Sequence, residues 1–230
     1  MDIGLALIII ATFIVVFFIA YGNALWKSIL TWFTRTTWIS ALPTQGWVQV
    51  TDRARGTAAK SLITKTSCPF WQLEVKEWRS SGRGGGYWKT VLKKPSGSFE
   101  LFDGTGQTNI LEGKTDVIVA QETRIDNPEP DVKLELESMG IKFTGFLGFK
   151  KRLKIFERVV NEGDDLLVVG KIQPRDSQNI LSGSFITPTL VSTLNKQSTI
   201  TTLLWKATRP MIIFWIIAAV VLVLLLFRII

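Results

Sequence analysis

Apolar residues are concentrated in two long runs near the ends of the chain. Residues 3–21 read IGLALIIIATFIVVFFIAY, without a charged side chain, and residues 211–227 read MIIFWIIAAVVLVLLLF. As helices, runs of this length cross a hydrocarbon core of about 30 Å. The pattern therefore predicts two membrane-spanning helices. A cleaved signal peptide is the alternative for the first run, but it would need a positive leading region, and only the charge of Asp2 precedes this run.

Charge and tryptophan positions predict how such helices would be oriented. Basic residues near the predicted span ends favour the side that holds the middle of the chain, so the positive-inside rule predicts a cytoplasmic middle domain. Four tryptophans flank the spans as expected of interfacial anchors: Trp26, Trp32, Trp38 and Trp205. The predicted segments are a first spanning helix (1–26), a Trp-rich connector (27–45), a β-rich domain (46–195), a second connector (196–209) and a second spanning helix (210–230).

Between the ends, short apolar runs that partly alternate with polar residues predict strands. Eight such runs lie between Gly46 and Thr193, separated by turn residues, which favours an antiparallel barrel or sandwich. One segment predicts a helix, with Asn127-Pro128 at its start and Gly140 after its end. The predicted fold class is therefore membrane-anchored α+β, in which two transmembrane helices flank a β-rich domain with one short helix.

The amino-acid composition excludes several classes of catalytic and metal site. The chain has 230 residues, 27 Lys plus Arg against 19 Asp plus Glu, a net charge of +8, a single cysteine and no histidine. These counts exclude Ser-His-Asp and Cys-His catalysis, zinc sites built from Cys and His, and an intramolecular disulfide. No cofactor and no metal are predicted. The positive charge favours an anionic partner, either lipid or nucleic acid.

Several motifs that resemble catalytic sites have simpler interpretations. The stretch SSGRGGGY, Ser80 to Tyr87, lacks the spacing of a phosphate-binding loop and is better interpreted as a hairpin tip. Asp103 and the glycines after it predict a tight turn. Acid pairs such as Glu74/Glu77 suit a solvated face better than general acid-base catalysis. Cys68 is as compatible with a buried small residue as with a reactive thiol.

One basic segment follows directly on an aromatic segment. Phe146 and Phe149 precede the cluster Lys150, Lys151, Arg152 and Lys154. If the aromatic residues are exposed, such a segment can insert into an anionic lipid leaflet, and each basic residue contributes about 1 kcal/mol near the surface. The alternative is that the aromatic residues belong to the core and the basic residues to the solvated face of a strand.

Three segments in order resemble the GIDE domain, also called the BAM or beside-a-membrane domain, of membrane-anchored mitochondrial RING-type ubiquitin ligases and prokaryotic relatives. They are SLITKTSCPFWQLEVKEW, FELFDGTG and FERVVNEGDDLLVVGKI. The positions that carry the resemblance are Phe99, Leu101, Asp103, Gly106, Glu157, Gly163, Asp164 and Gly170. The resemblance implies a β-rich sensing or interaction module beside a membrane. The zinc ligands of the RING finger are absent from this sequence, so the catalytic part of those ligases is not implied.

Three functions remain open from the sequence. The favoured one is a non-catalytic module that binds a protein or anionic lipid at the cytoplasmic membrane face, with membrane-stress or defence signalling as a possible setting and homo-oligomerisation left open. The second is a component of a ubiquitin-ligase-like system that acts with a separate RING partner. The third is a domain like an OB fold that binds single-stranded nucleic acid on Trp71, Trp78, Tyr87 and Trp88. Nucleic acid is the less favoured partner.

Overall fold

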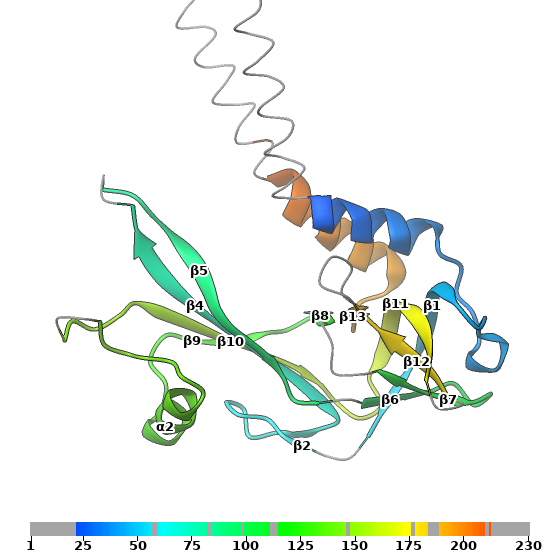
Figure 1. The fold of residues 1–230 in the computed structure, drawn as a ribbon, viewed down its shortest axis with the longest axis horizontal. Coiled ribbons are helices and arrows are strands. Elements are labelled where there is room, and N and C mark those ends of the chain that lie inside the picture. The colour runs from blue at the N-terminus through cyan, green and yellow to red at the C-terminus, as the bar shows by residue number, and fades with distance from the viewer. Residues whose placement is uncertain are drawn as a thin grey trace, which may run out of the picture. The chain divides into compact units, whose positions relative to one another are not determined.

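The structure is a computed structural model that describes residues 22–56, 59–81, 84–97, 99–110, 115–145, 148–175, 178–183, 189–209 and 212. It divides into two compact units. One is Thr36–Leu194, and the other joins the two ends of the chain, Met1–Arg35 and Asn195–Ile230. The first unit holds the strands and is called the β-rich unit (Figure 1).

The elements of the β-rich unit are short and numerous. They are η1 (Ile39–Ala41), β1 (Gly46–Arg55), β2 (Ala59–Lys60), β3 (Ser67–Cys68), β4 (Phe70–Ser80), β5 (Gly86–Pro95), β6 (Phe99–Phe102), β7 (Gln107–Ile110), β8 (Thr115–Ile118), β9 (Thr123–Ile125), α2 (Pro130–Ser138), β10 (Leu153–Val160), β11 (Asp165–Arg175), β12 (Gln178–Ser182) and β13 (Thr189–Ser192). The β-rich character predicted from the sequence is confirmed.

Five of the strands close into a barrel. β1 pairs with both β6 and β11, and the ring continues through β7 and β12, where β7 and β12 are parallel and the other pairs antiparallel. β13 adds to β11, and β8 adds to β13. The sequence left barrel and sandwich open, and the pairing of β1 with β11 decides for a barrel.

The barrel interior is filled by alternate residues of its strands. Val48 and Val50 of β1, Leu101 of β6, and Leu166 and Val168 of β11 belong to one buried cluster. Because side chains alternate between the two faces of a strand, the period-two pattern of the sequence places these residues on the inner face. Full burial of each such side chain stabilises the fold by about 1.5–3 kcal/mol.

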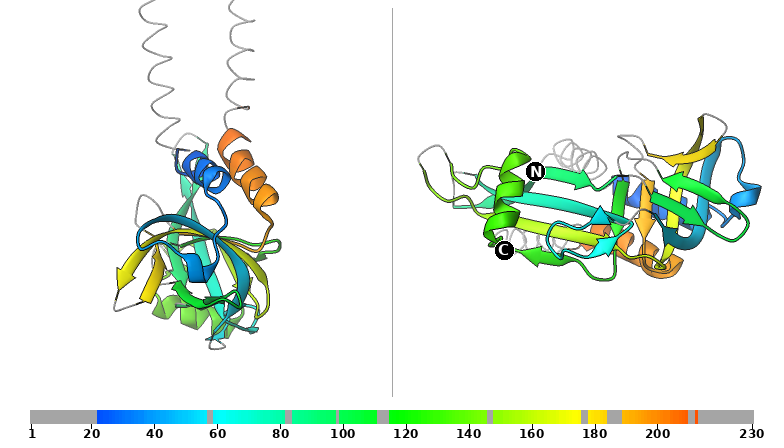
Figure 2. Two further views of the ribbon diagram at one scale, coloured as in Figure 1. Left: turned by 90° about the vertical axis from the view of Figure 1, so that its right-hand side faces the viewer. Right: turned by 90° about the horizontal axis from the view of Figure 1, so that it is seen from below.

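A second sheet has the order β5-β4-β10-β9, with all neighbours antiparallel. Leu73 and Val75 of β4 lie on the same face as Ile155 of β10, and this face packs against Val132 and Leu136 of α2 in a second core. Figure 2 shows α2 crossing the strands of this sheet. The other face of the sheet carries charged residues.

Helix α2 lies inside the segment for which the sequence predicts a helix, but it starts later. Pro130 occupies the first helical turn and Glu129 is the N-cap, rather than Asn127-Pro128. Proline is tolerated there because the first N–H groups of a helix lack intrahelical acceptors. Gly140 follows the helix with a φ of +87°, which suits glycine because it has no Cβ.

The buried carboxylate of Glu157 holds the loop between β2 and β3. Its side chain accepts hydrogen bonds from the N–H of Ile63 (2.8 Å), the N–H of Thr64 (2.9 Å) and the hydroxyl of Thr64 (2.9 Å), and the residue is 1% exposed. Burial of a carboxylate is costly unless its oxygens are hydrogen-bonded. These three donors meet that requirement, so Glu157 joins β10 to a loop more than ninety positions earlier in the chain.

The second unit contributes two helical segments, residues 22–33 and 196–209. On the first, Trp26, Ile29, Trp32 and Phe33 are exposed, whereas Ser28 and Thr31 are buried and donate their hydroxyls to the carbonyls of residues 24 and 27. Lys196 donates to the carbonyl of Thr34 at 3.0 Å. This unit therefore exposes several aromatic side chains in its described part.

The structure corrects the prediction of a membrane-anchored fold. The predicted spans 3–21 and 211–227 lie outside the described residues, except for Ile212. No helix in the described ranges is long and apolar enough to cross a membrane. The described helix 22–33 would measure about 18 Å, against about 30 Å for a hydrocarbon core, and it includes Lys27. Within the described residues, the predictions of two spanning helices and of an integral membrane protein with a cytoplasmic domain are therefore contradicted.

Loss of the Glu157 carboxylate is expected to destabilise the β-rich unit. Glu157→Ala leaves the two loop N–H groups without their acceptor, and we expect the free energy of unfolding to fall by about 2 kcal/mol. Urea denaturation followed by circular dichroism measures this change. Glu162→Ala, at an exposed turn position, is the matched control and should leave the midpoint unchanged. Equal midpoints for the two variants would contradict the role assigned to Glu157.

Candidate basic pocket

The segment that precedes β10 forms a small turn of its own. The N–H of Gly145 donates to the carbonyl of Phe149 at 2.8 Å, and the N–H of Lys151 donates to the carbonyl of Phe143 at 2.8 Å. Phe143 packs against the second core, whereas Phe149 is 73% exposed. Phe146 lies outside the described residues. The sequence allowed an exposed or a core position for Phe146 and Phe149, and the structure shows that Phe149 is exposed.

Strand register brings this basic segment beside two tryptophans. The N–H of Trp78 donates to the carbonyl of Arg152 at 2.9 Å, which extends the β4–β10 ladder by one position, and Trp78 lies directly opposite Trp88 of β5. Together with the end of β9, these residues surround a hollow of about 640 Å³. We call it the basic pocket, and its lining is Trp78, Trp88, Arg124, Asp126, Asn127, Lys150, Lys151, Arg152, Leu153 and Lys154.

The tryptophans of the basic pocket support two of its cations. The Trp78 and Trp88 rings meet edge to face with centroids 5.3 Å apart. The Arg152 guanidinium lies 5.5 Å from the centroid of Trp78, and Lys154 Nζ lies 4.1 Å from that of Trp88. Such cation–π contacts contribute about 0.5–1 kcal/mol each at exposed sites. They hold both cations at the pocket wall.

Two further cations of the pocket are neutralised by carboxylates. Arg124 forms a two-pronged ion pair with Asp126, with Nε–Oδ1 and Nη2–Oδ2 distances of 3.0 and 2.8 Å, and the pKa of Asp126 is lowered by this pairing. Lys151 Nζ lies 3.2 Å from Glu77 Oε1. Among the described residues, no carboxylate lies within ion-pair distance of Lys150, Arg152 or Lys154. These three side chains therefore carry the net charge of the pocket.

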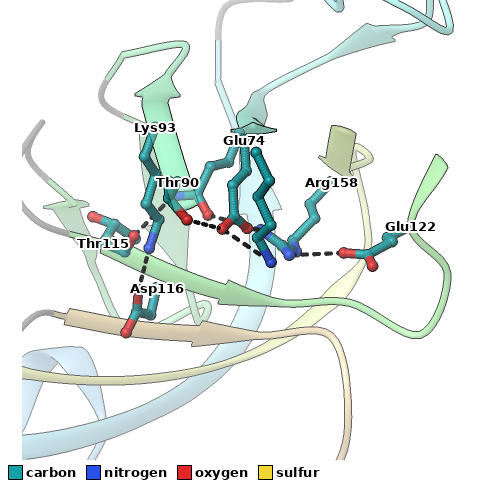
Figure 3. A network of polar contacts seen from close by, with 9 residues as sticks. Glu74, Thr90, Lys93, Thr115, Asp116, Glu122 and Arg158 are labelled. Carbon is teal, nitrogen blue, oxygen red and sulfur yellow. Dashed lines mark hydrogen bonds and ion pairs between the residues drawn. The ribbon is translucent and has the colours of Figure 1, made fainter. Parts of the chain in front are cut away.

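A paired network occupies the same face of the sheet nearer the barrel (Figure 3). Arg158 donates to Glu74 at 3.0 Å and to Glu122 at 2.8 Å, and the Thr90 hydroxyl donates to Glu74 at 3.0 Å. Burial opposes ionisation of Glu74, but the neighbouring cations Lys76 and Arg158 outweigh it, and the pKa of Glu74 is lowered. Glu74 therefore stays ionised beside its ion-pair partners, and the network joins β4, β5 and β10 to Glu122.

The other candidates for chemistry also have structural roles. Cys68 is buried with its thiol 3.6 Å from the carbonyl of Ala59, and burial raises the pKa of the thiol. A raised pKa disfavours the reactive thiolate. Within the part of the chain that the structure describes, no group of three or more Cys, Asp or Glu residues is placed to hold a metal ion.

The four predicted anchor tryptophans are all exposed. Trp26 and Trp32 lie on the helical segment 22–33, Trp38 is the N-cap of η1, and Trp205 lies on the helical segment 196–209. Their exposed fractions range from 45% to 64%. Exposure is compatible with an interfacial position but does not test it, so the anchoring role stays a prediction.

Asp103 fastens η1 to the turn between β6 and β7. One carboxylate oxygen accepts from the N–H of Ile39 at 2.6 Å, and the other accepts from the N–H groups of Thr105 and Gly106 at 2.8 and 3.1 Å. Burial opposes ionisation of Asp103, but these donors outweigh it and lower its pKa. A Cβ on Gly106 would lie 3.1 Å from the Ile39 side chain, so glycine permits the close approach of η1.

The remaining positions of the predicted family resemblance are also structural. Phe99 packs in the barrel core against Phe70, with ring centroids 5.0 Å apart. Gly163 has a φ of +82°, and Asp164 accepts from the N–H of Asn161 at 2.8 Å in the same turn. A Cβ on Gly170 would contact Thr189 and Leu181 at 3.3–3.4 Å inside the barrel. These residues determine the fold and do not line the basic pocket.

The tryptophans that the sequence predicted as stacking platforms occupy different environments. Trp71 is buried in the second core, so it is excluded as a platform for base stacking. Trp78 and Trp88 line the basic pocket, which the sequence did not join to the cluster at Lys150–Lys154. Sequence reasoning also missed Arg124 and Asp126. Their alternate positions, which place both side chains on one face of an extended strand, were the available signal.

No family model matches the chain, and no curated protein and no solved structure matches it. The resemblance to the GIDE domain therefore stays a prediction that rests on the sequence motifs alone.

Gly86 is expected to be essential for the shape of the basic pocket. A Cβ at this position would lie 2.5 Å from the Trp78 ring and 2.6 Å from the carbonyl oxygen of Arg79, so Gly86→Ala must displace the ring. We expect a loss of about 1–3 kcal/mol of stability and an altered tryptophan signal in near-ultraviolet circular dichroism.

Gly85→Ala is the matched control, because its Cβ would meet only the flexible hydroxyl of Ser81 at 3.1 Å. An unchanged tryptophan signal in Gly86→Ala, or an equal change in both variants, would contradict the proposed packing of Trp78 on Gly86.

Proposed function

We propose that the β-rich unit is a non-catalytic binding module that docks on an anionic lipid surface through the basic pocket. The observation that carries the proposal is the convergence of Lys150, Arg152 and Lys154, without carboxylate partners among the described residues, beside the exposed Phe149. A cluster of like charges is unfavourable unless an anion offsets the repulsion. The arrangement is therefore more readily explained by a ligand than by the stability of the fold.

Lipid is favoured over an acidic protein because an exposed aromatic side chain precedes the basic residues. Phe149, which directly precedes Lys150 in the chain, is 73% exposed. Large apolar side chains beside basic residues are typical of surfaces that lie at the boundary between headgroups and acyl chains. Basic residues near such a surface contribute about 1 kcal/mol each, and this contribution falls with increasing salt.

Flotation with vesicles tests this function. The full-length chain is mixed with neutral vesicles or with vesicles that contain phosphatidylglycerol, at low and at high salt. Because the chain also contains two long apolar runs, 3–21 and 211–227, the quantity compared is the increase in binding between neutral and anionic vesicles. We expect this increase to weaken at high salt and to fall at least tenfold at low salt in the triple variant K150Q/R152Q/K154Q, because three contributions of about 1 kcal/mol are lost.

The matched control removes the same charge elsewhere. Lys60, Lys94 and Lys171 are exposed and lie outside the pocket, so the triple variant K60Q/K94Q/K171Q should keep most of the increase. An equal loss in both triple variants would show diffuse attraction without a site. No increase with anionic vesicles in the unaltered chain would overturn the function, and an acidic protein would then be the partner to seek.

A further inference from the structure

We infer that the basic pocket selects closely spaced phosphate groups over isolated anionic charges. This inference rests on the proposed function, since it takes the same pocket as the binding site. It goes further because it specifies the chemical class of the ligand, namely two or more phosphates within one molecule or headgroup. The charges of the pocket, its tryptophan contacts and its neighbouring polar residues all support this class.

The net positive charge of the pocket matches closely spaced phosphates. After Arg124 is paired with Asp126 and Lys151 with Glu77, Lys150, Arg152 and Lys154 form no ion pair among the described residues, although Asp126 also attracts Lys154 at longer range. A carboxylate or a phosphodiester brings a single negative charge, whereas a phosphate monoester brings about 1.5–2 at neutral pH. One isolated phosphodiester leaves most of the positive charge uncompensated. Two phosphodiesters held close together compensate two of the three charges, and two phosphate monoesters or three linked phosphates can compensate all three.

The cations of the pocket are held in place before a ligand binds. Residues 150, 152 and 154 occupy alternate positions at the entry to β10, and such positions share one face of an extended strand. The contacts of Arg152 with Trp78 and of Lys154 with Trp88 hold two of these cations at the pocket wall before any ligand binds. The planar guanidinium of Arg152 can donate two parallel hydrogen bonds to one phosphate. A cluster fixed in this way favours a ligand whose charges are themselves held together.

The tryptophan rings of the pocket are poorly placed for nucleobase stacking. Single-stranded nucleic acid binding uses ring faces on which bases stack. In the basic pocket, Lys154 lies over the face of Trp88, Arg152 over that of Trp78, and the two rings meet each other edge to face. The rings are therefore engaged in supporting cations. The pocket is better suited to phosphate groups than to a base.

Asp126 limits how much negative charge the pocket binds. Its carboxylate neutralises Arg124, so that a fourth cation is withheld from the ligand and excess negative charge is repelled. Asn127 also lines the pocket and can donate its amide to a phosphate or accept from a hydroxyl. Removal of the Asp126 charge should therefore strengthen binding of a phosphate-rich ligand, an effect that partial unfolding would not produce.

Isothermal titration of the full-length chain with soluble probes tests the ligand chemistry. The probes are tripolyphosphate, orthophosphate and citrate, where citrate supplies three carboxylates in one small molecule. We expect tripolyphosphate to bind at least tenfold more tightly than either of the others. K150Q/R152Q/K154Q should lose this binding, K60Q/K94Q/K171Q should keep it, and Asp126→Asn should tighten it severalfold. Equal affinities for citrate and tripolyphosphate, or weaker binding by Asp126→Asn, would overturn the inference.

Vesicles then distinguish a lipid source from a free phosphate. Cardiolipin holds two phosphates in one headgroup, so cardiolipin vesicles are compared with phosphatidylglycerol vesicles of the same phosphate content. Tighter binding to cardiolipin by fivefold or more supports the inference for lipids. Equal binding to both, with no binding of tripolyphosphate, overturns the inference and leaves the proposed function standing. Binding of tripolyphosphate without any increase on anionic vesicles overturns the proposed function and supports the inference for a soluble ligand.

Discussion

The antiparallel register of β4 and β10 is the constraint on which the rest of the site depends. The pair runs from Phe70 opposite Val160, beside the barrel, to Glu77 opposite Leu153, beside the pocket. Because side chains alternate along both strands, one register places Leu73 and Ile155 in the core beneath α2 and charged residues on the opposite face. A shift by one residue would exchange the two faces and bury the charges. Core packing and the position of the basic pocket are thus fixed together.

Along the charged face, paired and unpaired ions occupy different places. Near the barrel, Arg158 and Glu74 are largely buried and satisfy each other, as a costly buried ion pair must. At the pocket, the side chains are more open to water, and Lys150 is exposed without a carboxylate partner among the described residues. Like charges a few ångströms apart in water repel by about 1 kcal/mol per pair. The fold tolerates this modest cost, and an anionic ligand would remove it.

Sequence patterns predicted the local features well and the long-range ones poorly. The basic cluster at Lys150–Lys154 and the helix before Gly140 follow from nearby residues, whereas the exposure of Phe149 was left open. Two features depend on pairing between strands that are distant in the sequence: the barrel closes through β1 and β11, and Trp78 meets Arg152. Period-two patterns do not specify which strands pair.

The same limit explains two errors of interpretation. Trp71 and Trp78 were both predicted as stacking platforms, yet their side chains point to opposite faces of β4. Trp71 belongs to the second core, and Trp78 lines the basic pocket. The apolar runs 3–21 and 211–227 have the composition of spanning helices, but apart from Ile212 they lie outside the described residues, and no described helix is long and apolar enough to cross a membrane. Composition alone did not separate these cases.

The most direct test of the central claim is the rate of lysine acetylation, followed residue by residue by mass spectrometry, in the full-length chain with neutral and with anionic vesicles. If the pocket is the contact surface, acetylation of Lys150 and Lys154 should slow at least fivefold on anionic vesicles, while Lys60, Lys94 and Lys171 should keep their rates. Uniform slowing of all five lysines, or slowing confined to the three outside the pocket, would contradict the account.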